Sequence, residues 1–346
     1  MNGDIVLWLV QDGVTNGAIY ALLSLALLLV FAVTRVIFVP QGEFITFAAL
    51  SLSLLEAGRA PGTIYILAIG GLAAAALEGF VALRERNWRR LPRAALLYIV
   101  LPLAVALFVA WAAPRKFPQW AQVAMVLAMV VPLGPIVYRI AYQPLASASV
   151  LVLFIVSMAV HYVLTGFSLV FFGAEGLRAS PFWDVNFKLG VMTVSAQSLS
   201  VVAASVLLII ALWLLFERSI YGKALRATAM NRVGARLVGI PTVLTGHLSF
   251  LLAAFIGAAS GILISPITTL YYDTGFLIGL KGFVGAILGG MASYPLAAAG
   301  ALALGLLESF ASFWASSFKE VIVFTSIIPM LVWLSLRSRH VEEDEE

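Results

Sequence analysis

Residues 201–216, VVAASVLLIIALWLLF, form a run in which Ser205 is the only polar residue. The run lacks the alternation of apolar and polar residues that is typical of a strand in a membrane β-barrel. Because lipid cannot satisfy free backbone polar groups, such a segment crosses a bilayer as an α-helix. The whole chain is similar, with 62% hydrophobic and 11% charged residues and a mean hydropathy of +1.04. The sequence therefore predicts an all-α polytopic membrane protein.

Hydropathy, with polar residues, proline and glycine as breaks, predicts about eleven spans and at least about nine. A spanning helix needs about 20 apolar residues. The segments 43–57 and 275–291 are short and carry polar side chains, so we expect them to be broken or re-entrant helices. The predicted spans are 14–33, 43–57, 62–83, 94–113, 119–138, 149–171, 197–216, 243–265, 275–291, 295–314 and 320–337.

Basic residues are distributed unequally between the two sets of loops. If residues 217–241 are cytoplasmic, fourteen Lys and Arg residues lie on the cytoplasmic side and six on the other, while Lys281 lies within a span. This asymmetry predicts that the N-terminus is outside and the C-terminus inside. The cytoplasmic set is Arg35, Arg84, Arg86, Arg89, Arg90, Arg93, Arg139, Arg218, Lys223, Arg226, Arg232, Arg236, Arg337 and Arg339, and the external set is Arg59, Arg115, Lys116, Arg178, Lys188 and Lys319.

Several function classes lack support in the sequence. The net charge of +4 reflects the cytoplasmic loops, so no nucleic-acid partner is expected. There is no cysteine, which excludes disulfides and thiolate metal sites. His161, His247 and His340 show no metal-site spacing, and neither a Walker A loop nor the HExxH and GxSxG motifs occur. We expect no cleaved signal peptide, no catalytic or metal-ligating residue and no cofactor on this chain.

Pairs of glycines four residues apart lie on one face of three predicted spans. They are Gly13 with Gly17, Gly257 with Gly261, and Gly285 with Gly289. Small residues allow helix backbones to approach closely in a membrane, where no hydrophobic force drives helices together. These pairs predict helix–helix contacts, with the lining of a solute path as the alternative.

Residues 217–241, ERSIYGKALRATAMNRVGARLVGIP, interrupt the apolar pattern with a basic segment. Gly222 and Gly239 mark its ends, and an apolar row recurs every four residues. Apolar and basic residues do not separate cleanly on a single helix, so the pattern predicts two short helices with a break at Asn231–Gly234. The alternative is an ordinary positive-inside loop.

Two ionisable side chains lie within predicted spans. Lys281 needs a partner or water, because a charge at the bilayer centre costs about 2.5–3.5 kcal/mol; Glu43, Glu308 and Asp273 are the candidates. Glu43 follows Pro40, Gln41 and Gly42, a combination that breaks a helix. Gln41, Glu43, Lys281 and Glu308 are therefore candidates for a pathway or gate, with structural ion pairing and helix breaking as the alternatives.

Four blocks resemble, in order, the permeases of branched-chain amino-acid ABC transporters. They are GAIYALLSLALLLVF (17–31) followed by QGEF (41–44), YRIAYQPLASASVLVLFIVSMAV (138–160), ERSIYGKALRATAMNRVGARLVGI (217–240) and GFLIGLKGFVGAILGGMASYPLAAAGALALGLLES (275–309). The resemblance covers residues 13–83 and 134–337 of one permease domain, 1–346. Residues 84–120 resemble an insertion that, with the following run, adds two crossings. Gln41 stands where the family usually has histidine.

The resemblance implies the membrane subunit of an importer in a bacterial inner membrane, not an enzyme. ATP and Mg²⁺ would bind two separate cytoplasmic ATPase subunits, a second permease would complete a heterodimer, and an external solute-binding protein would deliver an amino acid or a related small compound. Docking of that protein is expected at Phe182, Trp183 and Phe187. Coupling to the ATPase is expected from Lys223, Leu225, Arg226, Ala229, Ala235, Leu237 and Gly239, with Ala229 and Leu237 as preferred contacts.

Two other classes stay open from the sequence. An ion-coupled secondary transporter would use membrane carboxylates, for which Glu43, Glu78 and Glu308 are available. A polytopic membrane enzyme would need a catalytic constellation that the sequence does not display. The tail 338–346 is acidic and is interpreted as a solvated run.

Overall fold

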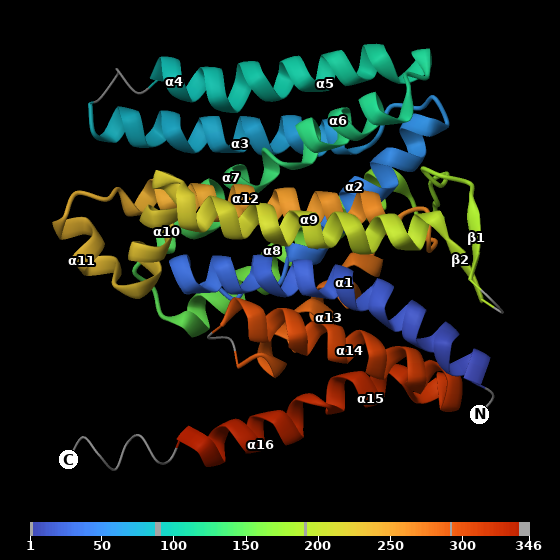
Figure 1. The fold of residues 1–346 in the computed structure, drawn as a ribbon. Coiled ribbons are helices and arrows are strands. Elements are labelled where there is room, and N and C mark those ends of the chain that lie inside the picture. Colours follow the sequence, from blue (N-terminus) through green and yellow to red (C-terminus); the bar gives the residue numbers. More distant parts are fainter. Residues whose placement is uncertain (1–2, 87–90, 190–191, 291–292, 339–346) are drawn as a thin grey trace. The chain divides into compact units, whose positions relative to one another are not determined.

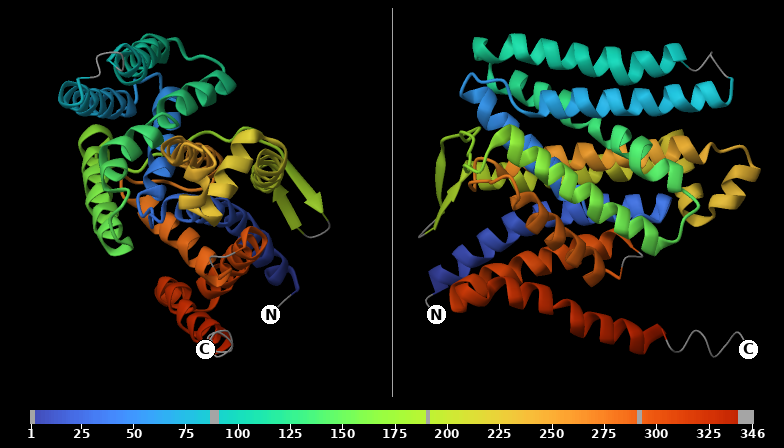
Figure 2. Two further views of the ribbon diagram at one scale, coloured as in Figure 1. Left: turned by 90° about the vertical axis from the view of Figure 1, so that its left-hand side faces the viewer. Right: turned by 180° about the vertical axis from the view of Figure 1, so that it is seen from behind.

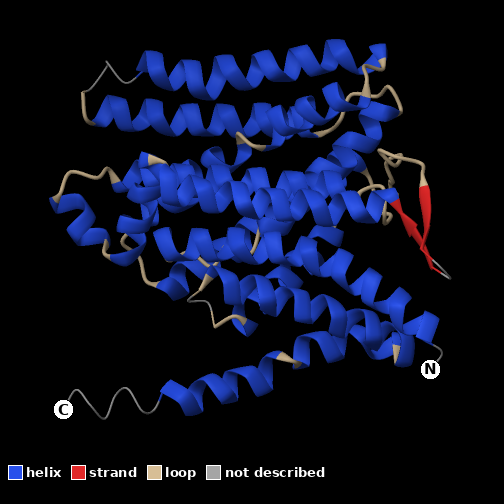
Figure 3. Ribbon diagram, viewed as in Figure 1, coloured by secondary structure: helices blue, strands red, loops and turns tan. Residues whose placement is uncertain are grey.

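A computed structural model describes residues 3–86, 91–189, 192–290 and 293–338, and these residues are almost entirely helical (Figures 1 and 3). The only strands within them are the short pair β1 and β2. The elements are α1 (Gly3–Thr34), α2 (Gln41–Glu56), α3 (Thr63–Arg84), α4 (Leu91–Ala95), α5 (Leu101–Ala112), α6 (Gln119–Val130), α7 (Leu133–Val137), α8 (Val150–Phe172), β1 (Asn186–Leu189), β2 (Met192–Ser195), α9 (Ala196–Arg218), α10 (Ile220–Met230), α11 (Arg232–Leu237), α12 (Thr242–Ile264), α13 (Thr274–Leu288), α14 (Tyr294–Trp314), α15 (Lys319–Thr325) and α16 (Ile327–Ser338).

Long apolar helices dominate the chain. Within the described ranges, nine helical stretches are long and apolar enough to cross a membrane. The prediction of an all-α polytopic membrane protein is confirmed. The two remaining predicted spans correspond to short helices, the 16-residue α2 and the 15-residue α13. The count of eleven crossings and the orientation of the termini stay predictions, and the acidic tail lies outside the described residues except for Ser338.

Close contacts between Cα atoms divide the chain into two compact units. Unit 1 comprises residues 1–28, 183–211 and 278–346, and unit 2 comprises residues 29–182 and 212–277. Each unit combines segments from distant parts of the sequence. The prediction of one permease domain over 1–346 stays a prediction, and the two units are described separately.

The buried centre of unit 2 is the helix α2. It begins after a break: Arg35 ends α1 with a φ of 62°, and Pro40 precedes the first residue of α2, as the combination of Pro40, Gln41 and Gly42 predicts. Every residue from Gln41 to Leu55 is buried. A helix this short that is buried all round fits a broken or re-entrant segment surrounded by protein.

Glycines bring α2 and α12 into direct backbone contact. A Cβ atom at Gly257 would lie 2.8 Å from Cβ of Phe44, and one at Gly261 would overlap the carbonyl oxygen of Ile45. Phe250, also on α12, packs its ring 4.7 Å from that of Phe38, which leads into α2. The predicted role of this glycine pair in helix packing is confirmed.

Replacing Gly261 with valine should destabilise unit 2 by about 1–3 kcal/mol, the usual cost of forcing extra volume into a packed contact. The matched control is Gly79→Val in α3, because nothing lies within 4 Å of a Cβ atom at Gly79. Thermal unfolding of the detergent-purified protein measures the difference. Equal melting temperatures for the two variants would show that α2 and α12 do not touch in this way.

Residues 91–112 of unit 2 form an arm that runs antiparallel to α3 (Figures 1 and 2). Its helix runs from α4 through a π-helical turn, Leu96–Val100, into α5. Pro102 lacks the backbone N–H that would continue regular hydrogen bonding to the carbonyl of Tyr98. That carbonyl oxygen instead meets Gly71 of α3 so closely that a Cβ atom there would overlap it. The arm therefore packs closely against α3, and the insertion of residues 84–120 stays a prediction.

Unit 1 is organised around contacts between α1, α13 and α14. A Cβ atom at Gly13 would lie 2.8 Å from Cα of Leu306, and one at Gly17 would lie 3.0 Å from Cα of Leu302. Gly285 of α13 and Gly289, which directly follows α13, face Ala301 and Ala297 of α14 in the same manner. All three predicted glycine pairs therefore lie at helix crossings.

A hairpin in unit 1 lies within the loop 172–196 and was not predicted from the sequence. β1 and β2 pair antiparallel, with Asn186 opposite Ser195 and Phe187 opposite Val194. Each strand has only four residues, which leaves too short a pattern for a reliable strand signal. The hairpin places Phe187 on an ordered element.

Candidate functional site

The basic segment after α9 folds as two short helices, α10 and α11. Ser219 caps α10 by accepting a hydrogen bond from N–H of Gly222, and Asn231 caps α11 by accepting one from N–H of Gly234. The predicted break is confirmed and lies at Asn231. Gly239, with φ of 85°, ends α11, and N–H of Ile240 donates to the carbonyl of Ala235 in the manner of a Schellman cap.

Gly222 has a different role from the one predicted. It lies in the first turn of α10 and does not end the segment. A Cβ atom there would overlap the carbonyl oxygen of Leu215 in α9. The glycine therefore permits the sharp corner between α9 and α10, and position 222 is part of the joint between a long apolar helix and the basic segment.

Polar contacts fix this helix pair to the rest of unit 2. Arg232 donates from Nη1 to the carbonyl oxygen of Ala146, at 3.0 Å, just before α8. Arg236 donates from Nε to Oγ1 of Thr242, at 2.9 Å, in the first turn of α12. Since α10 also packs against α12, the helix pair is attached to α12 by both polar and packing contacts.

The helix pair exposes large apolar side chains among polar ones such as Lys223 and Arg236. The side chains of Met230 and Leu237 are 87% and 84% exposed, and three further large apolar side chains of the same segment are exposed: Ile220, Val233 and Val238. We call these five residues the outer face of α10–α11. Several exposed apolar side chains on one short segment mark an interaction surface.

The seven predicted coupling residues separate by burial. Leu225 and Ala235 are 1% and 3% exposed and face inward, so their side chains position the helices and do not form the outer surface. The four-residue spacing alone could not reveal this, because the break at Asn231 turns α11 relative to α10. Lys223, Leu237 and Gly239 are exposed, and Arg226 and Ala229 are half-buried.

Glu43 lies at the start of α2 and pairs with His161 of α8. Oε1 of Glu43 is 2.9 Å from Nδ1 of His161, and Oγ1 of Thr165 lies 3.3 Å from the same nitrogen. The ring of Phe276 stacks on the imidazole with a centroid distance of 4.3 Å. His161 therefore has a carboxylate partner, which the sequence spacing of the histidines did not indicate. The two residues are 118 positions apart, so no local spacing signals the pair.

Unsatisfied polar atoms lie beside this pair. Oε2 of Glu43 and Oε1 of Gln41 are buried and have no hydrogen-bond partner among the described residues. Nε2 of Gln41 donates to the carbonyl oxygen of Ala253 in α12, at 2.9 Å. Buried polar atoms usually pair with protein or ordered water, so the start of α2 is a candidate element of a polar path.

Lys281 of α13 lies in a buried ionic cluster in unit 1. Its Nζ donates to Oε1 of Glu308 at 2.6 Å and to Oε1 of Glu320 at 3.0 Å. Tyr20 donates its hydroxyl to the other oxygen of Glu308, at 2.6 Å, and Lys319 lies 3.5 Å from Glu308. Of the predicted partners, Glu308 is the one found in contact, and the cluster joins α1, α13, α14 and α15.

The three predicted docking aromatics are not equally accessible. Trp183 and Phe187 are exposed, whereas Phe182 is half-buried and packs near Trp120 with a centroid distance of 5.7 Å.

No group of three His, Asp or Glu side chains suited to a metal ion occurs within the described ranges.

Comparison with known families decides the assignment. Residues 9–334 match the family described as "Branched-chain amino acid transport system / permease component". This chain belongs to that permease family. The match includes α2, α10–α11 and the Lys281 cluster, so the permease carries these elements within its family region.

Curated relatives are 27% identical to the permease over the aligned residues. The high-affinity branched-chain amino acid transport system permease protein LivH of Escherichia coli K12 is 27% identical over 205 residues, which is 56% of this chain and 65% of that protein. The corresponding protein BraD of Pseudomonas aeruginosa is 27% identical over 207 residues, 58% of this chain and 67% of BraD. A probable LivH of Methanocaldococcus jannaschii is 27% identical over 210 residues, 58% of this chain and 66% of that protein. The alignment thus spans about two thirds of each relative. No solved structure matches the permease.

Proposed function

We propose that this permease is the membrane-spanning subunit of an ATP-driven importer and that α10–α11 receives the movement of a cytoplasmic ATPase. The observation that carries this proposal is the outer face of α10–α11: exposed apolar side chains on a capped, basic helix pair in a member of the permease family. A solvated positive-inside loop has no need of exposed apolar side chains at Met230, Val233 and Leu237.

The contacts within unit 2 supply a route for this movement. Arg236 and the packing of α10 link the helix pair to α12. In turn α12 contacts α2 through Gly257, Gly261 and the hydrogen bond from Gln41 to Ala253. Because packed helices shift as rigid bodies, a tilt of α12 moves the start of α2, where Glu43 and His161 lie. In this proposal Gln41 and Glu43 belong to the gate.

The Lys281 cluster is the corresponding element of unit 1. Its four ionisable groups lie on three helices, with Lys281 and Glu308 both buried. A buried pair holds one arrangement of helices only while both partners stay in place. In this proposal the ion pair of Lys281 and Glu308 breaks and re-forms during each transport cycle.

The remaining parts of the importer are inferred from the family. Two cytoplasmic ATPase subunits bind ATP and Mg²⁺, and a second, similar permease forms a heterodimer with this chain in a bacterial inner membrane. An external solute-binding protein docks near Trp183, Phe187 and Phe182. The relatives' printed names make branched-chain amino acids the first cargo to test, followed by other amino acids and related small compounds.

Disrupting the outer face should separate the permease from its ATPase. We expect Leu237→Asp to lower the amount of ATPase that copurifies from co-expressing cells by at least about tenfold, because a buried, unpaired carboxylate costs several kcal/mol at an interface. Leu237→Met, which keeps an apolar side chain, is the matched control. Equal copurification of both variants would remove α10–α11 from the coupling surface.

The ion-coupled alternative has its own expected result. Glu43 and Glu308 are buried carboxylates in helices of the membrane region, which is the feature that a secondary transporter would use. Uptake by purified permease in vesicles that contain no ATPase, driven by an imposed proton or sodium gradient, would favour that alternative and contradict the proposal.

A further inference from the structure

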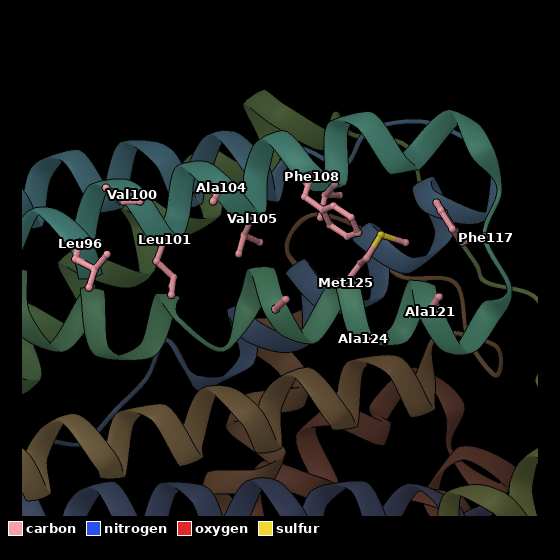
Figure 4. Close-up of a pocket in the computed structure, with 12 residues that line it drawn as sticks. Leu96, Val100, Leu101, Ala104, Val105, Phe108, Phe117, Ala121, Ala124 and Met125 are labelled. Carbon is pink, nitrogen blue, oxygen red and sulfur yellow. The ribbon is translucent and has the colours of Figure 1, made fainter.

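An open apolar groove lies between the arm of residues 91–112 and α6 (Figure 4). Its volume is about 690 Å³, and every lining residue is apolar. One wall is the face of α4–α5 that carries Leu96, Leu101 and Phe108, and the other is the face of α6 that carries Ala124 and Met125. The volume lies within the range of about 300–1,000 Å³ that is typical of ligand pockets.

The groove arises from small residues at helical spacing. Ala121, Ala124 and Ala128 recur along one face of α6, and Ala104 lies opposite on α5. Val109 and Met125, which also line the groove, are buried. Large side chains on one helix thus face alanines on the other, and the space between the helices remains open along its length.

The dimensions fit a hydrocarbon chain. Leu96–Phe108 covers about 18 Å at about 1.5 Å per helical residue, and half of a bilayer core is about 15 Å thick. Both walls belong to helices long and apolar enough to span a membrane. A groove of this length without polar lining, on helices of this kind, has the dimensions and the chemistry to hold an acyl chain.

Positive charge marks one end of the groove. Residues 84–93 contain five arginines and one glutamate, Glu85. Among the described residues of this stretch, Arg84, Arg86 and Arg93 are exposed. Arg93 precedes Leu96 by about one helical turn, so its guanidinium can reach the headgroup level above a chain that lies along Leu96 and Val100. Arginine binds phosphate groups through paired N–H donors.

We propose that the groove and Arg93 form a binding site for one anionic phospholipid, with an acyl chain between α5 and α6 and the phosphate beside Arg93, assisted by Arg84. The site lies on the arm of residues 91–112. It includes no residue of the proposed coupling surface, α10–α11, or of the proposed gate, Gln41 and Glu43. Its ligand is selected by negative charge at the headgroup and by one apolar chain.

Native mass spectrometry of the purified permease tests the proposal with two probes that have identical chains. Dioleoyl phosphatidylglycerol should be retained in preference to dioleoyl phosphatidylethanolamine. Arg93→Gln should weaken the binding of phosphatidylglycerol about fivefold, the factor expected for one basic residue near an anionic surface. Arg218→Gln, at an exposed arginine at the end of α9, should leave binding unchanged.

Filling the groove is the complementary change. Ala124→Phe should abolish retention of both lipids without altering the melting temperature, because Ala124 is exposed to the groove. If Ala124→Phe does not fold, Ala124→Cys provides the measurement, since the chain has no other cysteine. A fluorophore on that thiol should be quenched by brominated-chain phosphatidylglycerol at lower concentration than by the brominated phosphatidylethanolamine.

Three results would overturn the proposal. Equal binding of the two lipids, or binding unaffected by Arg93→Gln, would show that the arginines do not select the ligand. Retention of phosphatidylglycerol in Ala124→Phe would place the lipid elsewhere. A photo-crosslinker at position 124 that captures another protein's helix in native membranes would show that the groove is a protein interface.

Discussion

Lys281→Met should destabilise the permease by about 3–5 kcal/mol, because it leaves the buried carboxylate of Glu308 without its closest cation. Nζ of Lys281 lies 2.6 Å from Glu308, and both side chains are less than a tenth exposed. Lys319 lies farther from Glu308, at 3.5 Å, and is more exposed, so it compensates only partly. We expect a lower melting temperature in detergent and loss of solute uptake in cells that express the complete importer.

The double variant Lys281→Met/Glu308→Gln separates stability from transport. Removing both charges should restore much of the melting temperature, because no buried ion remains unpaired between these two positions. Uptake should stay low if the ion pair of Lys281 and Glu308 must break and re-form in each transport cycle. A single variant that melts and transports like the wild type would exclude an essential charge at position 281.

Glu43→Gln should reduce uptake by at least about tenfold while ATPase subunits still copurify. Glutamine replaces the carboxylate that pairs with His161 by a neutral amide. Hydrogen bonds to charged groups contribute about 1.5–3 kcal/mol. The variant also removes the negative charge at Oε2 of Glu43, which is buried without a partner among the described residues, while the amide still forms hydrogen bonds. Uptake and copurification measured on the same membranes give the two values.

Ser51→Ala is the matched control for Glu43→Gln. Ser51 is buried in the same helix, about two turns beyond Glu43, and forms a hydrogen bond of 2.6 Å with Thr63. It should affect stability and spare uptake.

Hydrogen–deuterium exchange over residues 35–45, with and without trapped ATP, adds a structural readout: the break before α2 should change its exchange rate in the wild type. An unchanged rate would describe a static helix break.

Composition and hydropathy were sufficient to predict the all-α membrane fold, since runs such as 201–216 admit few other structures. The short segments at α2 and α13 were also predictable, because Pro40, Gly42 and the polar residues near them shorten the apolar run. Glycine spacing indicated which helix faces meet, and the structure supplied the partners, such as Leu302 and Leu306 for Gly17 and Gly13.

Contacts between distant segments were harder to predict. His161 and Glu43 come together only when α8 packs beside the start of α2. No sequence motif near either residue indicates its partner. Three carboxylates were candidates for Lys281, and the fold selects Glu308. The inward orientation of Leu225 and Ala235 depends on the turn at Asn231, which a four-residue repeat does not encode. Tertiary packing decides each of these cases.

The central claim is that an ATPase moves this permease through α10–α11, and cross-linking from position 237 tests it most directly. Because the sequence has no cysteine, Leu237→Cys provides a single thiol for a maleimide photo-crosslinker in native membranes. We predict a product that joins the permease to the ATPase subunit and changes in yield when ATP hydrolysis is trapped, with none from Trp213→Cys, which lies exposed on α9. Labelling of position 237 only from outside the cell, or cross-linking to no ATPase, would contradict the account.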